Sequence, residues 1–415
     1  MVLGNATAEP QAAAGGPAGP RGLAGILRDG ELQSRLERAA RALCRLDGAV
    51  TASPLADLYL TMQAKREAAR SATLAGGTAN LTDVLSQGDV QGASAGAILA
   101  SRCLRALEAA TKLSTDLGGP ADRLVEIHRI LDADGTPGDP SEGGSASPAL
   151  QEVSDHLDSV LLEAASPMLA HLGLLQAQLE AVAPFPAGNG RLARLLVPVA
   201  LHRRRGIALG ISDYLLGHAS EYGALSGPGA ASEGRDPWLA FFLQGIAESA
   251  SQAVDEIARL AALREEHRKA VTASLGHAVP KALRVLDCLL GRPLATVAEI
   301  RVITGTSYVA ANQLVSRLVD LGILEEVTGF RRNRVFLYGP YVRILDQGRP
   351  AEPAAFKTES APKAKSPKAA RKPAAPGSGK PPSEGPDDEA GRPVAAQAGP
   401  PSTGRRSPDL ADHLL

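Results

Sequence analysis

The chain has 415 residues and a formal net charge of -1 at pH 7, so it can hold two or three domains, and no overall field directs it to nucleic acid or to a membrane. Hydrophobic residues make up 44 % of the sequence but aromatic residues only 3 %, which indicates a helical protein packed with Ala and Leu. Cys44, Cys103 and Cys288 are far apart, which argues against a zinc site or a disulfide framework. No apolar run approaches the ~20 residues of a membrane-spanning helix, so we expect a cytoplasmic protein without a membrane partner.

Changes in composition divide the chain into segments. Leu32, Leu36 and Leu43 follow the three- and four-residue steps of an amphipathic helix, and Gly/Pro/Ser-rich stretches interrupt such patterns. Segments rich in Ala, Gly, Pro and Lys cannot bury a core and are expected to be disordered. The predicted domains are a disordered 1–22, a helical N-terminal region 23–131, a helical core 149–270, a small C-terminal unit 280–345 and a disordered basic tail 349–415.

One interruption of the helical pattern has the composition of an anion site. Residues 183–194 read Ala-Pro-Phe-Pro-Ala-Gly-Asn-Gly-Arg-Leu-Ala-Arg, and a helix is predicted from position 191 to about 205. The glycines can adopt backbone angles closed to other residues, and the positive end of the helix faces the same point. The candidate ligands of a di- or triphosphate are Gly188, Asn189, Gly190, Arg191 and Arg194. The alternative is a helix N-terminus with a glycine turn and two solvated arginines.

The surroundings of this loop resemble the Fic family, whose motif runs His-x-Phe-x-Asp/Glu-Gly-Asn-Gly-Arg-x-x-Arg. Phe185 and the five candidate ligands stand at motif places, and Glu221-Tyr222 and the run Trp-Leu-Ala-Phe-Phe-Leu at 238–243 resemble the closing helices of the family. The resemblance spans most of residues 30–345. It implies a mainly α protein, with an all-helical Fic fold followed by a small winged-helix (α+β) domain. The family activity that it implies is AMP transfer from ATP to a protein hydroxyl.

The positions that carry this family chemistry are altered. Ala183 replaces the motif histidine, which takes the proton from the target hydroxyl, and Ala187 replaces the acidic residue that holds Mg²⁺. Ala75 replaces the glutamate of the family's inhibitory element. The segment between His128 and Gln151 lacks the aromatic and strand-like pattern of the hairpin that clamps the target protein.

With base, metal ligand, inhibitory glutamate and clamp all replaced, we expect a non-catalytic Fic protein that requires no cofactor. The loop could still bind ATP or another phosphate-bearing ligand without Mg²⁺. The alternatives are a protein adenylyltransferase with an unusual motif and a protein-interaction scaffold. Many Fic proteins self-associate, so a homo-oligomer is left open.

The C-terminal unit resembles a winged helix-turn-helix. Residues 296–303 read as its first helix with Thr296 as N-cap, residues 307 to about 321 as its second helix, and residues 327–338 as a wing. In a DNA complex the second helix would enter the major groove, and the wing arginines would hold phosphates or enter the minor groove. The candidate DNA contacts are Ser307, Tyr308, Asn312, Ser316, Arg331, Arg332 and Arg334.

Protein contact is the alternative role for this unit. The tail favours DNA as a partner, because its lysines and arginines between positions 357 and 380 could follow a phosphate backbone. The acidic stretch at 387–389 favours a solubilising linker instead.

Overall fold

The computed structural model describes residues 29–86, 94–112, 119–132, 148–162, 167–226, 235–329 and 333–346. The chain divides into two units, Met1–Ala355 and Phe356–Leu415, and the second lies outside the described residues. The predicted disorder of 1–22 and of the tail at 349–415 therefore concerns residues that are not described. The same is true of positions 133–147, which make up most of the segment compared with the target-clamping hairpin.

The described part is mainly helical, as predicted, and carries one small sheet. Eleven described helices precede the C-terminal subdomain, which begins at Gly276. They are α2 Gly30–Ala52, α3 Ala56–Leu74, α4 Leu81–Leu85, α5 Ala95–Lys112, α6 Pro120–Leu131, α7 Pro148–Leu162, α8 Met168–Val182, α9 Asn189–Arg205, α10 Ser212–Gly217, α11 Ala219–Ser226 and α12 Asp236–Ser274.

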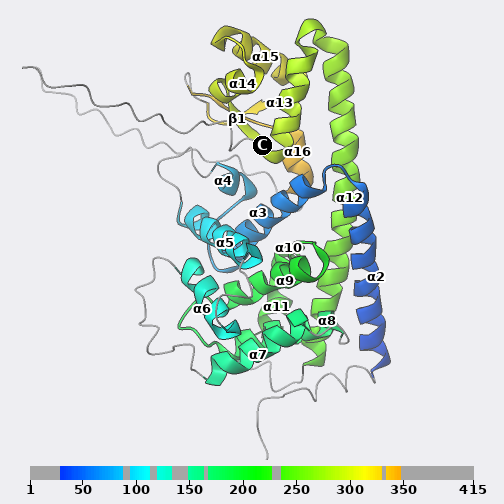
Figure 1. The fold of residues 1–415 in the computed structure, drawn as a ribbon, viewed down its shortest axis with the longest axis vertical. Helices are drawn as coiled ribbons and strands as arrows, with labels where there is room; N and C mark the ends of the chain where they lie inside the picture. The colour runs from blue at the N-terminus through cyan, green and yellow to red at the C-terminus, as the bar shows by residue number, and fades with distance from the viewer. Residues whose placement is uncertain are drawn as a thin grey trace, which may run out of the picture. The chain divides into compact units, whose positions relative to one another are not determined.

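Two helices that are distant in sequence form one side of the helical body. The Asp29 side chain caps α2 by accepting from the backbone N–H groups of Glu31 and Leu32. The apolar stripe of α2, which includes Leu32 and Leu43, is buried. This face packs along the long helix α12, so that α2 and α12 run side by side (Figure 1). Burial of the stripe explains why the three- and four-residue steps were visible in the sequence.

Helix α8 lies in the core and leads into the candidate loop. Leu172, Leu175 and Leu179 are fully buried along it. At Gly173 the helix comes so close to α12 that a Cβ atom would lie 2.7 Å from Cδ1 of Phe242. The indole N–H of Trp238 donates to the carbonyl oxygen of Gly173 at 2.7 Å. The end of α8, and hence the start of the loop, is therefore fixed against α12.

The C-terminal subdomain combines short helices with a small antiparallel sheet. Its elements are η2 Gly276–Ala278, α13 Val279–Gly291, β1 Leu294–Thr296, α14 Val297–Thr304, α15 Tyr308–Asp320, β2 Glu325–Glu326, β3 Val335–Leu337 and α16 Gly339–Leu345. The three strands pair antiparallel in the order β1-β3-β2. Helix α13 folds back beside the end of α12 (Figure 1).

Local signals for this subdomain are confirmed in detail. Thr296 caps α14 in a capping box with Glu299. Four apolar residues of α15 are buried: Ala311, Leu314, Val315 and Leu318.

The structure differs from the prediction at several element boundaries and in one helix. Helix α12 continues to Ser274 instead of ending near 270, and β2 precedes position 327, where the wing was expected to begin. The chain also closes with a helix, α16, that the sequence pattern did not predict. Pro340 at its start and only seven residues of helix give a weak periodic signal.

Among the described residues, no helix has the length and apolar character needed to cross a membrane.

Candidate functional site

The loop between α8 and α9 has a fixed backbone. Ala183 ends α8 in the left-handed region, with φ 45° and ψ 61°, which costs a residue with a Cβ roughly 1–2 kcal/mol. The Asn189 side chain closes the loop: its Oδ1 accepts from the Phe185 N–H at 3.0 Å, and its Nδ2 donates to the Phe185 carbonyl oxygen at 2.6 Å. The Asn189 amide is thus committed to holding the loop.

Gly188 is the N-cap of α9 and has a conformation that only glycine adopts at low cost. Its φ is +80°, and an added Cβ would lie 3.1 Å from Nη2 of Arg191 and 3.3 Å from Nε2 of His128. Helix α9 has no side-chain cap and no acidic residue in its first turn. Its first backbone N–H groups have no partner within the helix, so this end carries the partial positive charge of the helix dipole.

His128 is a loop contact that the sequence analysis did not identify. It comes from the last turn of α6, and its ring stacks on Phe185 with centroids 3.9 Å apart and planes 5° apart. Its Nε2 lies 2.7 Å from the Ala187 carbonyl oxygen. A carbonyl oxygen only accepts, so Nε2 carries the hydrogen in this contact. No spacing signal links position 128 with the loop, because the contact depends on how α6 packs against α9.

Arg191 extends from the first turn of α9 to the end of α6. Its Nη1 donates to the Leu131 carbonyl oxygen at 2.9 Å, and its Nη2 lies 3.6 Å from Oδ1 of Asp132. The guanidinium therefore neutralises the negative end of α6.

Arg194 is buried and held by two other helices. Its Nε donates to Oγ of Ser71 at 3.1 Å, its Nη2 to the Ser71 carbonyl oxygen at 3.0 Å and its Nη1 to the Tyr222 hydroxyl at 3.2 Å. Two solvated arginines were the alternative to an anion site. The structure corrects this, because each guanidinium has partners within the protein, and of the two only Arg191 is partly exposed.

Two carboxyl groups lie near Arg194, those of the half-buried Glu180 and the buried Glu67. Glu180 accepts from the Tyr222 hydroxyl at 2.8 Å, and burial raises the pKa of its carboxyl above the usual range. Glu67 accepts from the Ser212 N–H at 3.1 Å and from the Ser212 hydroxyl, and burial raises its pKa as well. Removal from water disfavours the charged form, and these hydrogen bonds offset that effect only in part.

The raised pKa of Glu67 predicts a pH-dependent difference in stability. The favourable contribution of this carboxyl is fully present below its usual pKa of 4.5 and is lost as the pH rises through the raised folded-state value. We expect Glu67→Gln, which keeps an acceptor for Ser212 but carries no charge, to gain stability relative to the wild type as the pH rises from about 4.5 to about 8.

Denaturant unfolding of both proteins across this pH range measures the difference. Glu37→Gln serves as the control, because Glu37 is an exposed carboxylate on α2. A wild-type protein that gains stability over Glu67→Gln as the pH rises would contradict the prediction.

The loop does not offer the ligands that a metal-bound nucleotide needs. No carboxylate stands at position 187, and the carbonyl oxygen of Ala187 is engaged by His128. Among the described residues, no group of three or more His, Cys, Asp or Glu side chains could hold a metal ion. The side chains of the loop therefore do not form a Mg²⁺ site.

Helix α3 connects the loop to the C-terminal subdomain. Ser71 holds Arg194, and its neighbour Arg70 pairs through Nη2 with Asp346 at 2.6 Å, directly after α16. One turn earlier, Nη1 of Arg66 donates to the Leu345 carbonyl oxygen at 2.8 Å. Successive turns of one helix therefore contact the loop arginine and the end of the C-terminal subdomain.

The predicted DNA contacts are only partly brought together. Ser307 caps α15, Tyr308 is 54 % exposed and Ser316 is exposed. Asn312 is half-buried, and its Oδ1 accepts from Nη2 of Arg334 at 2.8 Å. The outward orientation predicted for Asn312 is thus corrected, since its amide oxygen anchors the wing.

Arg334 has further contacts within the subdomain. Its guanidinium lies 3.7 Å from Glu326 and 5.3 Å above the Phe336 ring. Arg331 and Arg332 lie outside the described residues.

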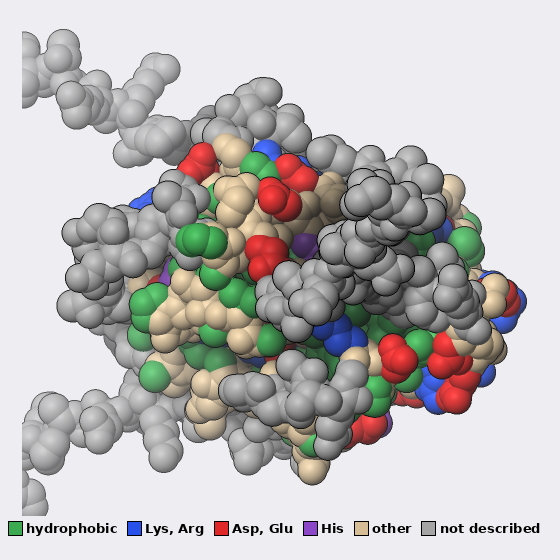
Figure 2. Space-filling model, turned by 90° about the horizontal axis from the view of Figure 1, so that it is seen from below, with side chains coloured by type: hydrophobic (Ala, Val, Ile, Leu, Met, Phe, Trp, Pro, Cys, Tyr) green, Lys and Arg blue, Asp and Glu red, His purple; other side chains and the backbone are tan. Residues whose placement is uncertain are grey.

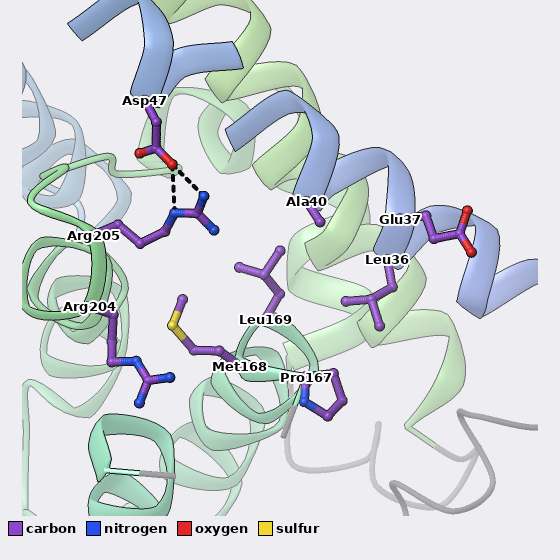
Figure 3. Close-up of a pocket in the computed structure, with 9 residues that line it drawn as sticks. All are labelled: Leu36, Glu37, Ala40, Asp47, Pro167, Met168, Leu169, Arg204 and Arg205. Carbon is purple, nitrogen blue, oxygen red and sulfur yellow. Dashed lines mark hydrogen bonds and ion pairs between the residues drawn. The ribbon is translucent and has the colours of Figure 1, made fainter. Parts of the chain in front are cut away.

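Two surface cavities lie away from the loop. One, of about 630 Å³, opens between α2, α8 and α9, where Met168 and Leu169 form an apolar wall and Arg205 points to Asp47 (Figure 3). Another, of about 880 Å³, lies between α2 and α12 and has a largely polar lining. Neither contains a loop residue. On the described part of the face in Figure 2, acidic and basic side chains are interspersed with apolar ones.

The chain was compared with protein family models and with solved structures. No protein family model matches the chain. A Fic family protein from Desulfovibrio desulfuricans G20 is similar in structure, with a TM-score of 0.43 and 12 % sequence identity over 72 % of this chain and 95 % of that one. A likeness of this size assigns no residue roles to this chain.

Proposed function

We propose that this chain is a Fic-like protein that has lost AMP-transfer chemistry and acts as a DNA-binding regulator through its C-terminal subdomain. The observation that carries the proposal is the order α13-β1-α14-α15-β2-β3, which leaves α15 with an exposed outer face. In helix-turn-helix proteins the second helix of the pair enters the major groove. The local charge supports this use, because residues 279–346 carry nine Lys and Arg against six Asp and Glu in a chain with a net charge of -1.

The loop argues against transfer chemistry. A methyl group at position 183 cannot accept a proton, and general-base help typically contributes about 10²–10⁴-fold to a rate. His128, the histidine that the structure brings to the loop, donates its Nε2–H to Ala187. Arg194, which would face a nucleotide phosphate in the family motif, is buried against Ser71 and Tyr222.

The retained feature of the loop is an anion-binding helix end. The uncapped start of α9 and the partly exposed Arg191 favour a phosphate-bearing ligand held without Mg²⁺. We propose that such a ligand competes with Leu131 and Asp132 for Arg191. The helical body would then respond to a ligand at the loop. Helix α3 connects the two regions, because Ser71 contacts Arg194 of the loop and Arg70 pairs with Asp346 directly after α16.

DNA binding is tested by fluorescence anisotropy of the full-length protein with a mixed-sequence duplex. Arg301 lies exposed on α14, the helix that crosses the phosphate backbone in this class of motif. We expect affinity to fall steeply between about 50 and 200 mM salt, and Arg301→Ala to weaken binding and reduce the slope of log K against log salt by roughly one.

Arg129→Ala is the matched control, because Arg129 is an exposed arginine on α6 in the helical body. Equal affinity of Arg301→Ala and the wild type would remove α14 from the DNA interface. An absence of binding at the lower salt would reject the proposed function.

A further inference from the structure

Helix α15 presents an exposed stripe without a free positive charge. Val309, Gln313 and Ser316 follow the spacing i, i+4, i+7, which places them within about 60° of one another around the helix axis. All three are exposed, and Val309 is 66 % exposed. A solvent-facing stripe of a valine, an amide and a hydroxyl is suited to contact with a surface that offers both methyl groups and paired hydrogen-bonding atoms.

The side chains of this helix that would read guanine are engaged elsewhere. Nη2 of Arg317 donates to the Ser274 carbonyl oxygen at 2.6 Å, which ties this guanidinium to the end of α12. Arg334, the wing arginine that the structure describes, donates to Oδ1 of Asn312. Guanine is normally recognised by Arg or Lys with two hydrogen bonds to O6 and N7, and among the described residues the stripe contains neither.

The surroundings of the stripe fit duplex DNA better than an apolar protein surface. The first turn of α15 has no acidic residue to neutralise its dipole, and the exposed Arg301 lies on the preceding helix. Three nearby carboxylates are each paired with an arginine, and these pairs are Glu299–Arg292, Glu325–Arg343 and Glu326–Arg334. Asp320, an exposed carboxylate in the last turn of α15, lies on the same side of the helix one turn beyond Ser316, so the positive charge is confined to the first turn of α15 and to the preceding helix. The N-terminal part of the stripe, whose residues contact base edges in this class of motif, is therefore complementary to a phosphate backbone.

We propose that this stripe reads A·T base pairs in the major groove. Val309 contacts the C5-methyl group of thymine, Gln313 donates from Nε2 to N7 of adenine and accepts at Oε1 from N6, and Ser316 donates to a neighbouring base or phosphate. The specificity of the protein is thus set by a methyl contact and an amide, with no arginine-to-guanine contact from α15. This inference rests on the proposed DNA-binding function.

The experiment selects duplexes from a random-sequence library with the full-length protein, and then compares selected duplexes that carry thymine or uracil at single positions. Uracil lacks the methyl group, and loss of one buried methyl contact should weaken binding about three- to fivefold at one position. Gln313→Ala should weaken binding about fivefold or more and relax selection at one adenine. Val309→Ala should bind the thymine and uracil duplexes equally.

Val319→Ala is the control, because Val319 is 38 % exposed on the same helix but lies about 80° from Val309 around the helix axis. It should keep the wild-type ratio between thymine and uracil duplexes. A selected motif that is read through G·C pairs and is indifferent to uracil overturns the inference and leaves DNA binding in place. Unchanged DNA affinity in both stripe variants overturns it as well and assigns this face to a protein partner. If no duplex is selected at low salt, the proposed function itself fails.

Discussion

Replacing Glu256 by alanine is expected to destabilise the protein by about 3–5 kcal/mol. Glu256 is fully buried on α12 and accepts hydrogen bonds from four side chains, which belong to Tyr59, Gln63, Arg66 and Gln252. Without it, the buried Arg66 guanidinium keeps only Asp213 as an acidic partner, at 3.0 Å. An uncompensated buried charge costs far more than the lost contact alone.

Denaturant unfolding of the full-length protein measures this effect. Asp287→Ala is the control, because Asp287 is 49 % exposed and pairs with Arg264 and Arg268 at the surface, where removal should cost about 1 kcal/mol or less. Glu256→Gln should fall between the two, since an amide keeps an acceptor but not the charge. If Glu256→Ala and Asp287→Ala lower the free energy of unfolding by similar small amounts, the hydrogen bonds between Glu256 on α12 and the side chains of α3 do not stabilise the fold.

Arg194→Ala is expected to destabilise the protein by about 2–4 kcal/mol, because the change removes a buried guanidinium and leaves its acceptors unsatisfied. The Ser71 carbonyl oxygen and the Tyr222 hydroxyl would both lose a donor. This outcome would identify the last motif arginine as a structural residue of this chain. A stability equal to that of the wild type would contradict the assignment.

Arg191→Ala separates ligand binding from stability at the same loop. The Arg191 side chain is 11 % exposed and has the Leu131 carbonyl oxygen and Asp132 as partners, so its loss should cost about 1–2 kcal/mol, less than the loss of Arg194. Millimolar pyrophosphate without Mg²⁺ should raise the Tm of the wild type, since a ligand at 100 times its Kd adds about 2.7 kcal/mol, and Arg191→Ala should lose this rise. An unchanged wild-type Tm would remove the phosphate ligand from the proposal.

Local sequence signals predicted the elements of this fold well. The capping box at Thr296, the glycine turn before α9 and the apolar stripe of α2 each depend on residues within a few positions of one another. Such signals are determined by backbone conformation and helical periodicity, which a single sequence displays directly. The short helix α16 was missed because seven residues give too few repeats.

The candidate site was predicted in composition but not in its contacts. Phe185 and the glycines were identified from their spacing, whereas the stacking of His128 depends on the packing of α6. The burial of Arg194 against Ser71 joins positions far apart in the chain. The pairing of Asn312 with Arg334 also depends on tertiary structure, so a helical wheel alone assigned Asn312 to the outer face.

The central claim is that this chain binds specific DNA through its C-terminal subdomain. The most direct test is selection of fragments from sheared genomic DNA by the purified full-length protein at moderate salt, with Gln313→Ala run in parallel. We predict that the wild type enriches fragments that share one motif, and that Gln313→Ala enriches them about fivefold less and no longer selects one adenine of the motif. Recovery of fragments with the composition of the input DNA by both proteins would contradict the account and would direct the search to protein partners of the helical body.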